Sequence, residues 1–376
     1  MWTTVTLPFM YSLVSSFSSQ EWEKTGSTRK ADSMQSARSL IFICLQIANM
    51  HIFMRKSSTF VQILCLIMRA RTITFAFALF LLAACGDHYE TIGGYAQGGL
   101  YSVCYNTRGA TAGRRQVKAA VDGILNAVDT TLSGYNRMSL LSRRNSGEDV
   151  ELNDMFRDIL EISEHYRELS GGAFDVAAGP LFDIWGFGFT ADSLPSDDAI
   201  AAAMERCRRK EVLNFNAIAQ GYSCDLVADY LHSIGVHDML VDIGEIYCEG
   251  LNPDGRGWTI GIDKPADGNE TPGAELSGIW KSDGGAYGVV TSGNYRKFYI
   301  RDGKKYAHTI DPRTGRPVEH NLLSATVIAP SATEADALAT YFMVAGLDEA
   351  RGFVESHPGI EACLISSDGV WTSEGF

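Results

Sequence analysis

A basic segment followed by an apolar one, at residues 68–84, indicates which part of this 376-residue chain forms the folded domain. Residues 68–71 carry two arginines, residues 72–82 are rich in apolar side chains, and small residues stand just before Cys85. The apolar stretch is short for a mature membrane-spanning helix, and the pattern is typical of a secretory signal peptide. We therefore predict a signal peptide at residues 68–84 and a folded region at residues 85–376.

The end of this segment, Leu82–Cys85, resembles the bacterial lipobox, in which the cysteine becomes the lipidated N-terminus of the mature protein. An ordinary signal anchor with an incidental cysteine is the alternative. We expect lipidation at Cys85, which would tether the protein to a membrane surface without inserting it. A signal start at Met68 also predicts that residues 1–67 are an upstream extension absent from the mature protein, which N-terminal sequencing would test.

The composition of the chain limits its partners. The net charge is −13, so we expect no nucleic-acid partner held by bulk electrostatics. A phosphate ligand would need a metal ion or local hydrogen-bond donors instead. The eight cysteines include no C-x-x-C pair, so their spacing indicates neither a zinc site nor a redox motif. Buried thiols are expected, and one or two disulfides stay open for an exported protein.

Helical and extended patterns are interspersed along the folded region, which indicates the α+β class. Apolar residues recur at helical spacing, for example at Val117, Val121 and Leu125. A stretch rich in glycine and aromatic residues at 173–188 is expected to be a loop that forms a ligand wall. The alternative is a hydrophobic plug between elements, which is favoured for Phe182 and Trp185 individually. We predict helices at residues 112–132, 153–170, 196–209 and 223–234, strands at 100–105, 239–250, 258–262, 288–293 and 322–329, and a hairpin at 295–310.

The segment Thr333–Thr340 is predicted to begin a helix, with Thr333 as the N-cap and an acid three residues later. Asp336 and Thr340 are four residues apart and share one helix face, so a carboxylate and a hydroxyl could point at the same spot. Two such oxygens near a helix N-terminus suit a hard cation that carries a phosphate. The alternative, which this segment alone favours, is a capping box with Thr340 bonding back into the helix.

Short motifs distributed along the chain carry a family resemblance. They occur in order at Gln97–Ser102, Leu132–Asn145, Ser170–Gly188, Ala217–Asp225, Thr291–Tyr295, His308–Gly315 and Thr333–Thr340. Examples are S-G-G-A-F-D, T-S-G-N-Y, H-T-I-D-P-R-T-G and T-E-A-D-A-L-A-T. Together they resemble the motifs of the ApbE family of FAD:protein FMN transferases. Gln97, Asn214 and Gln220 stand where Met, Asp and Lys are common in that family.

The resemblance implies a T-fold-like α+β architecture, with mixed sheets flanked by helices and two closely joined subdomains. It also implies that FAD is the substrate, that Mg²⁺ is required, and that FMN moves to a Ser/Thr hydroxyl of an exported acceptor flavoprotein while AMP leaves. Such acceptors include subunits of redox-driven ion pumps, so we expect a lipid-anchored protein on the periplasmic side of the inner membrane. A Mg²⁺-dependent FAD pyrophosphatase and a non-catalytic, lipid-anchored flavin-binding protein remain as alternatives.

The same resemblance assigns roles to individual residues. Asp336, the Thr340 hydroxyl and the Ala217 backbone carbonyl would bind Mg²⁺. His308 would act as the general base for the acceptor hydroxyl, and the alternative is a strand histidine bonded to Asp311 or to the backbone. The positions implied to contact FAD are Gln97, Tyr135, Ala173, Phe174, Asp175, Asn214, Gln220, His308 and Ile310.

Overall fold

The computed structural model describes residues 88–187, 194–266, 273–294, 298–301, 304–307 and 309–376. All of them belong to one compact unit, Asp87–Phe376. The predicted leader, its cysteine Cys85 and the candidate base His308 lie outside the described residues. Among the described residues, no helix combines the length and the apolarity needed to cross a bilayer.

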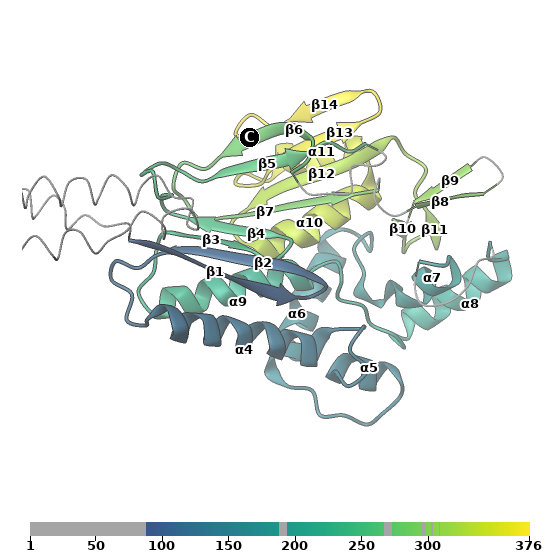
Figure 1. Cartoon of the computed structure of the whole chain (residues 1–376). Coiled ribbons are helices and arrows are strands. Elements are labelled where there is room, and N and C mark those ends of the chain that lie inside the picture. Colours follow the sequence, from purple (N-terminus) through teal and green to yellow (C-terminus); the bar gives the residue numbers. More distant parts are fainter. Residues whose placement is uncertain (1–87, 188–193, 267–272, 295–297, 302–303, 308) are drawn as a thin grey trace, which may run out of the picture. The chain divides into compact units, whose positions relative to one another are not determined.

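An eight-stranded sheet with the order β1-β2-β3-β4-β7-β12-β13-β14 forms the centre of the unit (Figure 1). Each neighbouring pair of strands in it is antiparallel. The predicted α+β class is therefore confirmed, but this sheet is purely antiparallel and not mixed. Its strands are β1 (Tyr89–Ala96), β2 (Gly99–Asn106), β3 (Met239–Asp242), β4 (Ile246–Glu249), β7 (Tyr287–Gly293), β12 (Leu322–Ala329), β13 (Glu361–Ser366) and β14 (Gly369–Thr372).

Helices cover one face of this sheet (Figure 1). The predicted apolar face of α4 is confirmed, because Val117, Val121 and Leu125 are buried against Val103 of β2 and Val241 of β3. Burial of such side chains contributes roughly 1.5–3 kcal/mol each. The helices that contact the sheet are α4 (Arg114–Leu132), α9 (Ala219–Ser233), α10 (Ala332–Ala345) and α11 (Leu347–Ser356). Two more helices pack on these: α5 (Leu140–Asn145) contacts α4, and α6 (Asp154–Leu169) contacts α4 and α10.

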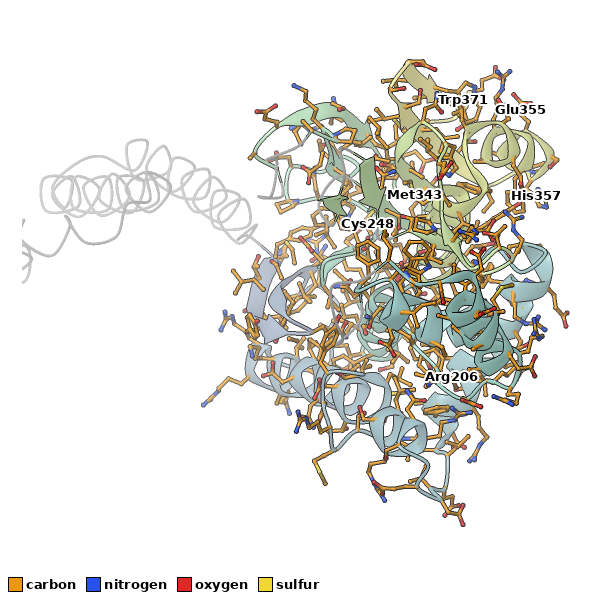
Figure 2. The ribbon with its side chains drawn as sticks, turned by 90° about the vertical axis from the view of Figure 1, so that its right-hand side faces the viewer. Arg206, Cys248, Met343, Glu355, His357 and Trp371 are labelled. Atoms are coloured by element: carbon orange, nitrogen blue, oxygen red, sulfur yellow. The ribbon has the colours of Figure 1, made fainter. Side chains whose placement is uncertain are left out.

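The opposite face of the sheet is covered by a hairpin, β5 (Thr259–Asp263) and β6 (Leu276–Lys281). Adjacent residues of a strand point to opposite faces, and Val289 and Val290 of β7 illustrate this. Val289 packs with Trp280 of the hairpin cluster, whereas Val290 belongs to the cluster on the helical side. Figure 2 shows Cys248 and Met343 among the packed side chains and Glu355 at the surface. The described cysteines are free thiols: Cys104, Cys207, Cys224, Cys248 and Cys363.

A smaller group of elements has its own apolar cluster and lies at one end of the molecule in Figure 1. Trp185 is buried there, and its indole Nε1 donates to the Gly315 carbonyl at 2.8 Å. This group includes the 3₁₀ turn η2 (Val176–Ala178), α7 (Gly179–Ile184), α8 (Asp197–Arg208), β10 (Ile310–Asp311) and β11 (Arg316–Pro317), and the hairpin β8 (Phe298–Arg301) and β9 (Lys304–Ala307) lies nearby.

Three sequence predictions need correction. Residues 239–250 are not one strand but the hairpin β3–β4, because Gly244 takes a φ of +97°, a left-handed conformation that turns the chain. Helix α9 begins at Ala219 rather than at residue 223. Residues 173–188 are not a plain loop, since they contain η2 and α7. The strand β1 was not predicted, and it pairs along its whole length with β2.

Candidate active site

The N-terminal ends of α9 and α10 meet with unusually little space between their backbones. A Cβ atom at Gly221 of α9 would lie 2.2 Å from the carbonyl oxygen of Ala332, the first residue of α10. It would also lie 2.8 Å from the Cβ of Asp336. Only glycine permits this approach, so Gly221 brings the first turn of one helix against the carboxylate of the other.

Asp336 completes the N-terminus of α9 from outside that helix. The N-cap residue of α9, Ile218, has no side-chain oxygen to offer. The Asp336 carboxylate accepts a hydrogen bond from the Gly221 amide at 3.0 Å instead. A first-turn amide is one of the donors that a helix cannot satisfy internally, so Asp336 serves α9 as a cap.

Asp225 of α9 returns this interaction at the N-terminus of α10. Its carboxylate accepts from the Ala332 amide at 2.9 Å, from the Thr333 amide at 2.8 Å and from the Thr333 hydroxyl. The predicted N-cap role of Thr333 is therefore wrong. Ser331 is the N-cap, with its hydroxyl accepting from the Glu334 amide at 3.1 Å, and Thr333 lies inside the first turn.

The two capping carboxylates are both desolvated. Asp336 is 5% exposed, and burial raises its pKa from 3.8 to about 7, with the nearby negative charge of Asp225 acting in the same direction. The hydrogen bond from Gly221 acts in the opposite direction. Burial also raises the pKa of Asp225. A low-dielectric site with two neighbouring carboxylates favours either a bound proton or a bound cation.

The predicted metal ligands fit a hard cation. Thr340 lies one helical turn after Asp336 on the same face of α10. Ala217 stands just before α9, whose first turn bonds to Asp336, and both Thr340 and Ala217 are partly exposed. A carboxylate, a hydroxyl and a backbone carbonyl are all oxygen donors, which is the set that Mg²⁺ accepts while keeping positions for water and phosphate oxygens.

Two of the predicted flavin-side residues are fixed against the start of α9. The Gln220 side chain donates from Nε2 to the Ile243 carbonyl at 3.0 Å. The Gln97 side chain donates from Nε2 to the Ser223 hydroxyl at 2.5 Å, and Gln97 has a φ of +51° in the turn between β1 and β2. Gln220 and Ser223 are three residues apart, so both glutamines lie beside one face of α9.

A second group of predicted residues joins residues 173–176 to the segment before α9. Ala173 and Phe174 are buried, while Asp175 accepts from the Ala177 amide at 2.8 Å and has its pKa raised by burial. The Asn214 amide donates to the Val176 carbonyl at 2.8 Å, and its side-chain oxygen accepts from the Asn216 amide at 2.9 Å. Asp175 and Asn214 thus lie on either side of the hydrogen bond that joins these two segments.

Tyr135 and Ile310 occupy contrasting environments. Tyr135 is 67% exposed, and its hydroxyl accepts from the Asn216 side-chain amide at 3.3 Å, which places its ring beside the segment that leads to Ala217. Ile310 is 2% exposed and packs in the small cluster with Trp185. Its side chain is part of a core there, and any contact with a ligand would come from its backbone.

The structure thus brings most of the predicted residues to the approach and first turn of α9. Sequence reasoning missed the reciprocal caps, in which Asp336 accepts from Gly221 of α9 and Asp225 accepts from the first turn of α10. The signal was present in Gly221-Tyr222-Ser223-Cys224-Asp225, because a glycine and an acid four residues apart share one helix face. That signal does not say which other helix the face meets, so the pairing is visible only in the fold.

Comparisons with known proteins identify the family of this chain. The model of the ApbE family matches residues 98–364. An "FAD:protein FMN transferase" of Vibrio cholerae is 32% identical over 314 residues, covering 77% of this chain and 92% of the relative. The relative of the same name from Escherichia coli K12 is 32% identical over 290 residues, covering 69% and 81%.

Solved structures also show similarity to ApbE proteins. The apo form of Pseudomonas stutzeri flavinyl transferase ApbE superposes with a TM-score of 0.67 at 34% identity, covering 77% of this chain and 95% of that one. The flavin transferase ApbE of Vibrio cholerae superposes with a TM-score of 0.65 at 30% identity, covering 77% and 98%. The family match covers residues 98–364, which include both helices that carry the candidate site, and the chain therefore belongs to the ApbE family.

Proposed function

We propose that this protein transfers FMN from FAD to a serine or threonine hydroxyl of an acceptor protein and releases AMP. The observation that carries the proposal is the similarity over nearly the full length of relatives named FAD:protein FMN transferase. The reaction breaks the bond between the two phosphates of FAD and forms a phosphoester bond to the acceptor oxygen. The acceptor hydroxyl loses a proton, and the departing AMP carries the other phosphate.

A proposed metal site would offset the negative charge of that pyrophosphate. Asp336, the Thr340 hydroxyl and the Ala217 carbonyl would hold Mg²⁺. When bound, Mg²⁺ supplies positive charge that offsets the phosphate oxygens. Asp336 is prepared for this role because it is buried, close to the acid Asp225 and held in place by the Gly221 amide.

Other residues would position the two ends of FAD. Gln97 and Gln220 are fixed by hydrogen bonds beside α9. Asp175 and Asn214 lie where residues 173–176 meet the segment before α9. These polar groups could orient the flavin nucleotide without adding positive charge of their own. His308 is proposed as the general base that takes the proton of the acceptor hydroxyl, because imidazole titrates near neutral pH.

The proposed setting is the periplasmic side of the inner membrane. Lipidation at Cys85 would anchor the domain there, and the acceptor would be an exported flavoprotein such as a subunit of a redox-driven ion pump. The signal-peptide pattern before Cys85 supports this setting. Mass spectrometry of the membrane fraction tests it: a mature chain that begins with lipidated Cys85 is expected, and a chain that keeps earlier residues contradicts it.

An acceptor-labelling assay tests the reaction. The full chain is incubated with FAD, Mg²⁺ and an acceptor-domain fragment that carries the target hydroxyl, and covalent flavin fluorescence is read on a denaturing gel while AMP is measured. Fluorescent acceptor formed together with AMP is expected. FMN and AMP formed without acceptor would instead identify an FAD pyrophosphatase, and bound FAD without turnover would identify a flavin-binding protein.

Two variants on the same helix separate the metal role from a general loss of structure. Asp336→Asn should abolish both AMP release and the dependence on Mg²⁺. Glu334→Gln, in the first turn of α10 and half-buried, should leave turnover within about threefold, because Glu334 is not among the proposed ligands. Equal losses in both variants would contradict the assignment of Asp336.

A further inference from the structure

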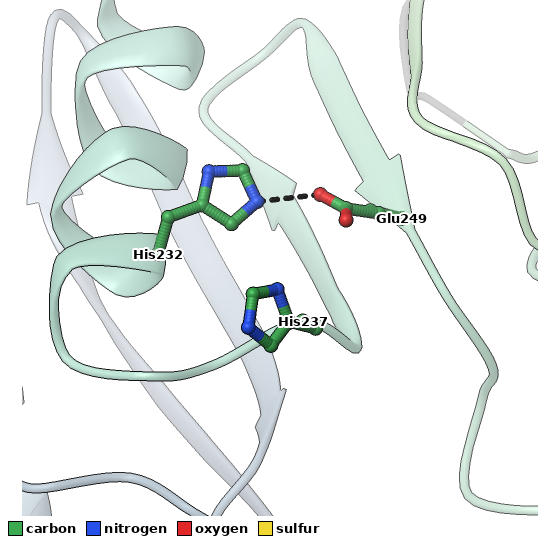
Figure 3. A group of neighbouring side chains, drawn as sticks. All are labelled: His232, His237 and Glu249. Carbon is green, nitrogen blue, oxygen red and sulfur yellow. Dashed lines mark hydrogen bonds and ion pairs between the residues drawn. The ribbon is translucent and has the colours of Figure 1, made fainter.

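A second cluster of side chains with metal-ligating chemistry lies away from the candidate active site. His232 comes from the last turn of α9, His237 from the loop that follows it, and Glu249 from the end of β4 (Figure 3). One ligand atom from each of the three lies within 4.8 Å of the other two. Figure 3 shows both imidazole rings and the carboxylate gathered on one side of the β3–β4 hairpin.

The fold fixes where these three side chains start. Leu231 and Val236 are fully buried, so the chain on either side of the loop is anchored in the core. In the register of the hairpin, Glu249 stands opposite Met239, two residues after His237. The convergence therefore follows from the helix end and the strand pairing, and it does not depend on a long free loop.

Glu249 is held from several directions. Its carboxylate contacts His232 Nε2 at 2.5 Å and accepts from the Tyr247 hydroxyl at 3.0 Å. Its backbone carbonyl accepts from the indole Nε1 of Trp258 at 2.9 Å. Partners of this kind orient a carboxylate ligand, and outer hydrogen bonds are a regular feature of protein metal sites.

We propose that His232, His237 and Glu249 form a binding site for a divalent transition metal ion, with zinc as the representative case. Two imidazole nitrogens and one carboxylate oxygen suit zinc and its neighbours, whereas Mg²⁺ prefers oxygen donors alone. Bonds of about 2.0–2.1 Å in tetrahedral zinc place ligand atoms about 3.3 Å apart. The three atoms reach that spacing through side-chain shifts on the order of 1 Å, because each pair already lies within 4.8 Å.

A simple ion pair explains only part of this arrangement. The contact between His232 and Glu249 could stand alone as a partly buried ion pair. It gives no reason for the second imidazole, whose ring centre lies 5.9 Å from that of His232. His237 is exposed, so an ion has access from solvent and a coordination position stays open for water or another ligand.

The proposed site is separate from the Asp336 site. His232 lies thirteen residues after Ala219 along α9, which is about 20 Å of helix. Gln220 and Gly221 stand at the other end of the same helix. An ion at His232 would tie the C-terminal end of α9 to the hairpin β3–β4 and would act as a structural clamp on the helix that carries the candidate active site.

Metal binding to the full chain, without a polyhistidine tag, tests the proposal. Zn²⁺ is titrated against a chromophoric chelator, and Co²⁺ is used as a spectroscopic substitute. One zinc ion should bind, and His237→Ala and Glu249→Gln should each weaken binding by at least about tenfold. The Co²⁺ spectrum should lack the intense near-ultraviolet band of sulfur ligation, because no cysteine belongs to the cluster.

Matched variants make the outcome decisive. His357→Ala removes an exposed histidine that stacks on Phe353 at the end of α11, and it should leave zinc affinity unchanged. Asp336→Asn should also leave it unchanged, which separates this site from the proposed Mg²⁺ site. Zinc should raise the thermal midpoint of the wild type but not of His237→Ala, whose folding is checked in chelator. Equal zinc affinity in wild type and His237→Ala, or a sulfur band in Co²⁺, would overturn the proposal.

Discussion

Replacement of Asp336 by Asn should make the metal-free protein more stable while it abolishes turnover. Asn is close in shape to Asp, and its side-chain oxygen can still accept the hydrogen bond from Gly221. It cannot carry the negative charge that burial disfavours in the wild type. A variant that only damaged the fold would lose stability and activity together, so the opposite signs are diagnostic.

The expected size follows from the pKa of Asp336, which burial raises from 3.8 to about 7. The folded protein therefore binds this proton more tightly than the unfolded chain, and stability falls as pH rises from about 4 to about 7. A shift of this size corresponds to about 4 kcal/mol. Asp336→Asn should gain up to that amount near pH 8 and almost nothing near pH 4.

Urea unfolding in EDTA at these two pH values measures the effect, and Mg²⁺ should narrow the difference at pH 8 by binding the wild type alone. Glu161→Gln, on the exposed side of α6, is the control and should change stability by less than about 0.5 kcal/mol. An Asp336→Asn protein that is less stable than wild type at pH 8 in EDTA would refute the desolvation argument. Wild-type AMP release in that variant would refute the metal assignment.

Further predictions concern the contact between the two helices. Gly221→Ala should lower the free energy of unfolding in urea by about 1–3 kcal/mol or more, because the new Cβ would collide with Ala332. Gly123→Ala in α4 is the control, and it should be neutral or stabilising because the space around Gly123 is open. Asp225→Ala should cost about 1–3 kcal/mol by leaving backbone amides of α10 without their acceptor. EDTA should stop AMP release by the wild type, and added Mg²⁺ should restore it; unchanged release in EDTA would contradict the proposed cofactor.

Much of the fold could be predicted because local patterns and tertiary packing agree. The strand at Leu322–Ala329 and the helix that ends at Leu132 were predicted closely, because the strand is a short apolar run and the helix repeats its apolar residues at helical spacing. The predictions failed where one residue changed the chain direction. Gly244 divides residues 239–250 into a hairpin, and the prediction of one strand overlooked the turn signal in Asp242-Ile243-Gly244-Glu245.

The candidate active site was predictable as a set of residues and not as an arrangement. The spacing of Asp336 and Thr340 on one helix face indicated oxygen ligands, and the ordered motifs indicated their family. The sequence assigned the cap to Thr333, whereas the fold gives it to Ser331 and turns Thr333 toward Asp225. A capping preference is a local property, and the Asp225 carboxylate that holds Thr333 comes from another helix.

The sequence by itself indicated the candidate oxygen ligands of the metal ion and the helix face that Asp336 and Thr340 share. It also indicated the family to which the chain belongs. Only the tertiary structure decided that Gly221 lets α9 and α10 touch and that Asp336 and Asp225 cap each other's helices. It also decided that His232, His237 and Glu249 converge at the far end of α9. The physical reason is that spacing along a chain fixes which side chains share a face, while desolvation and convergence depend on which faces pack together.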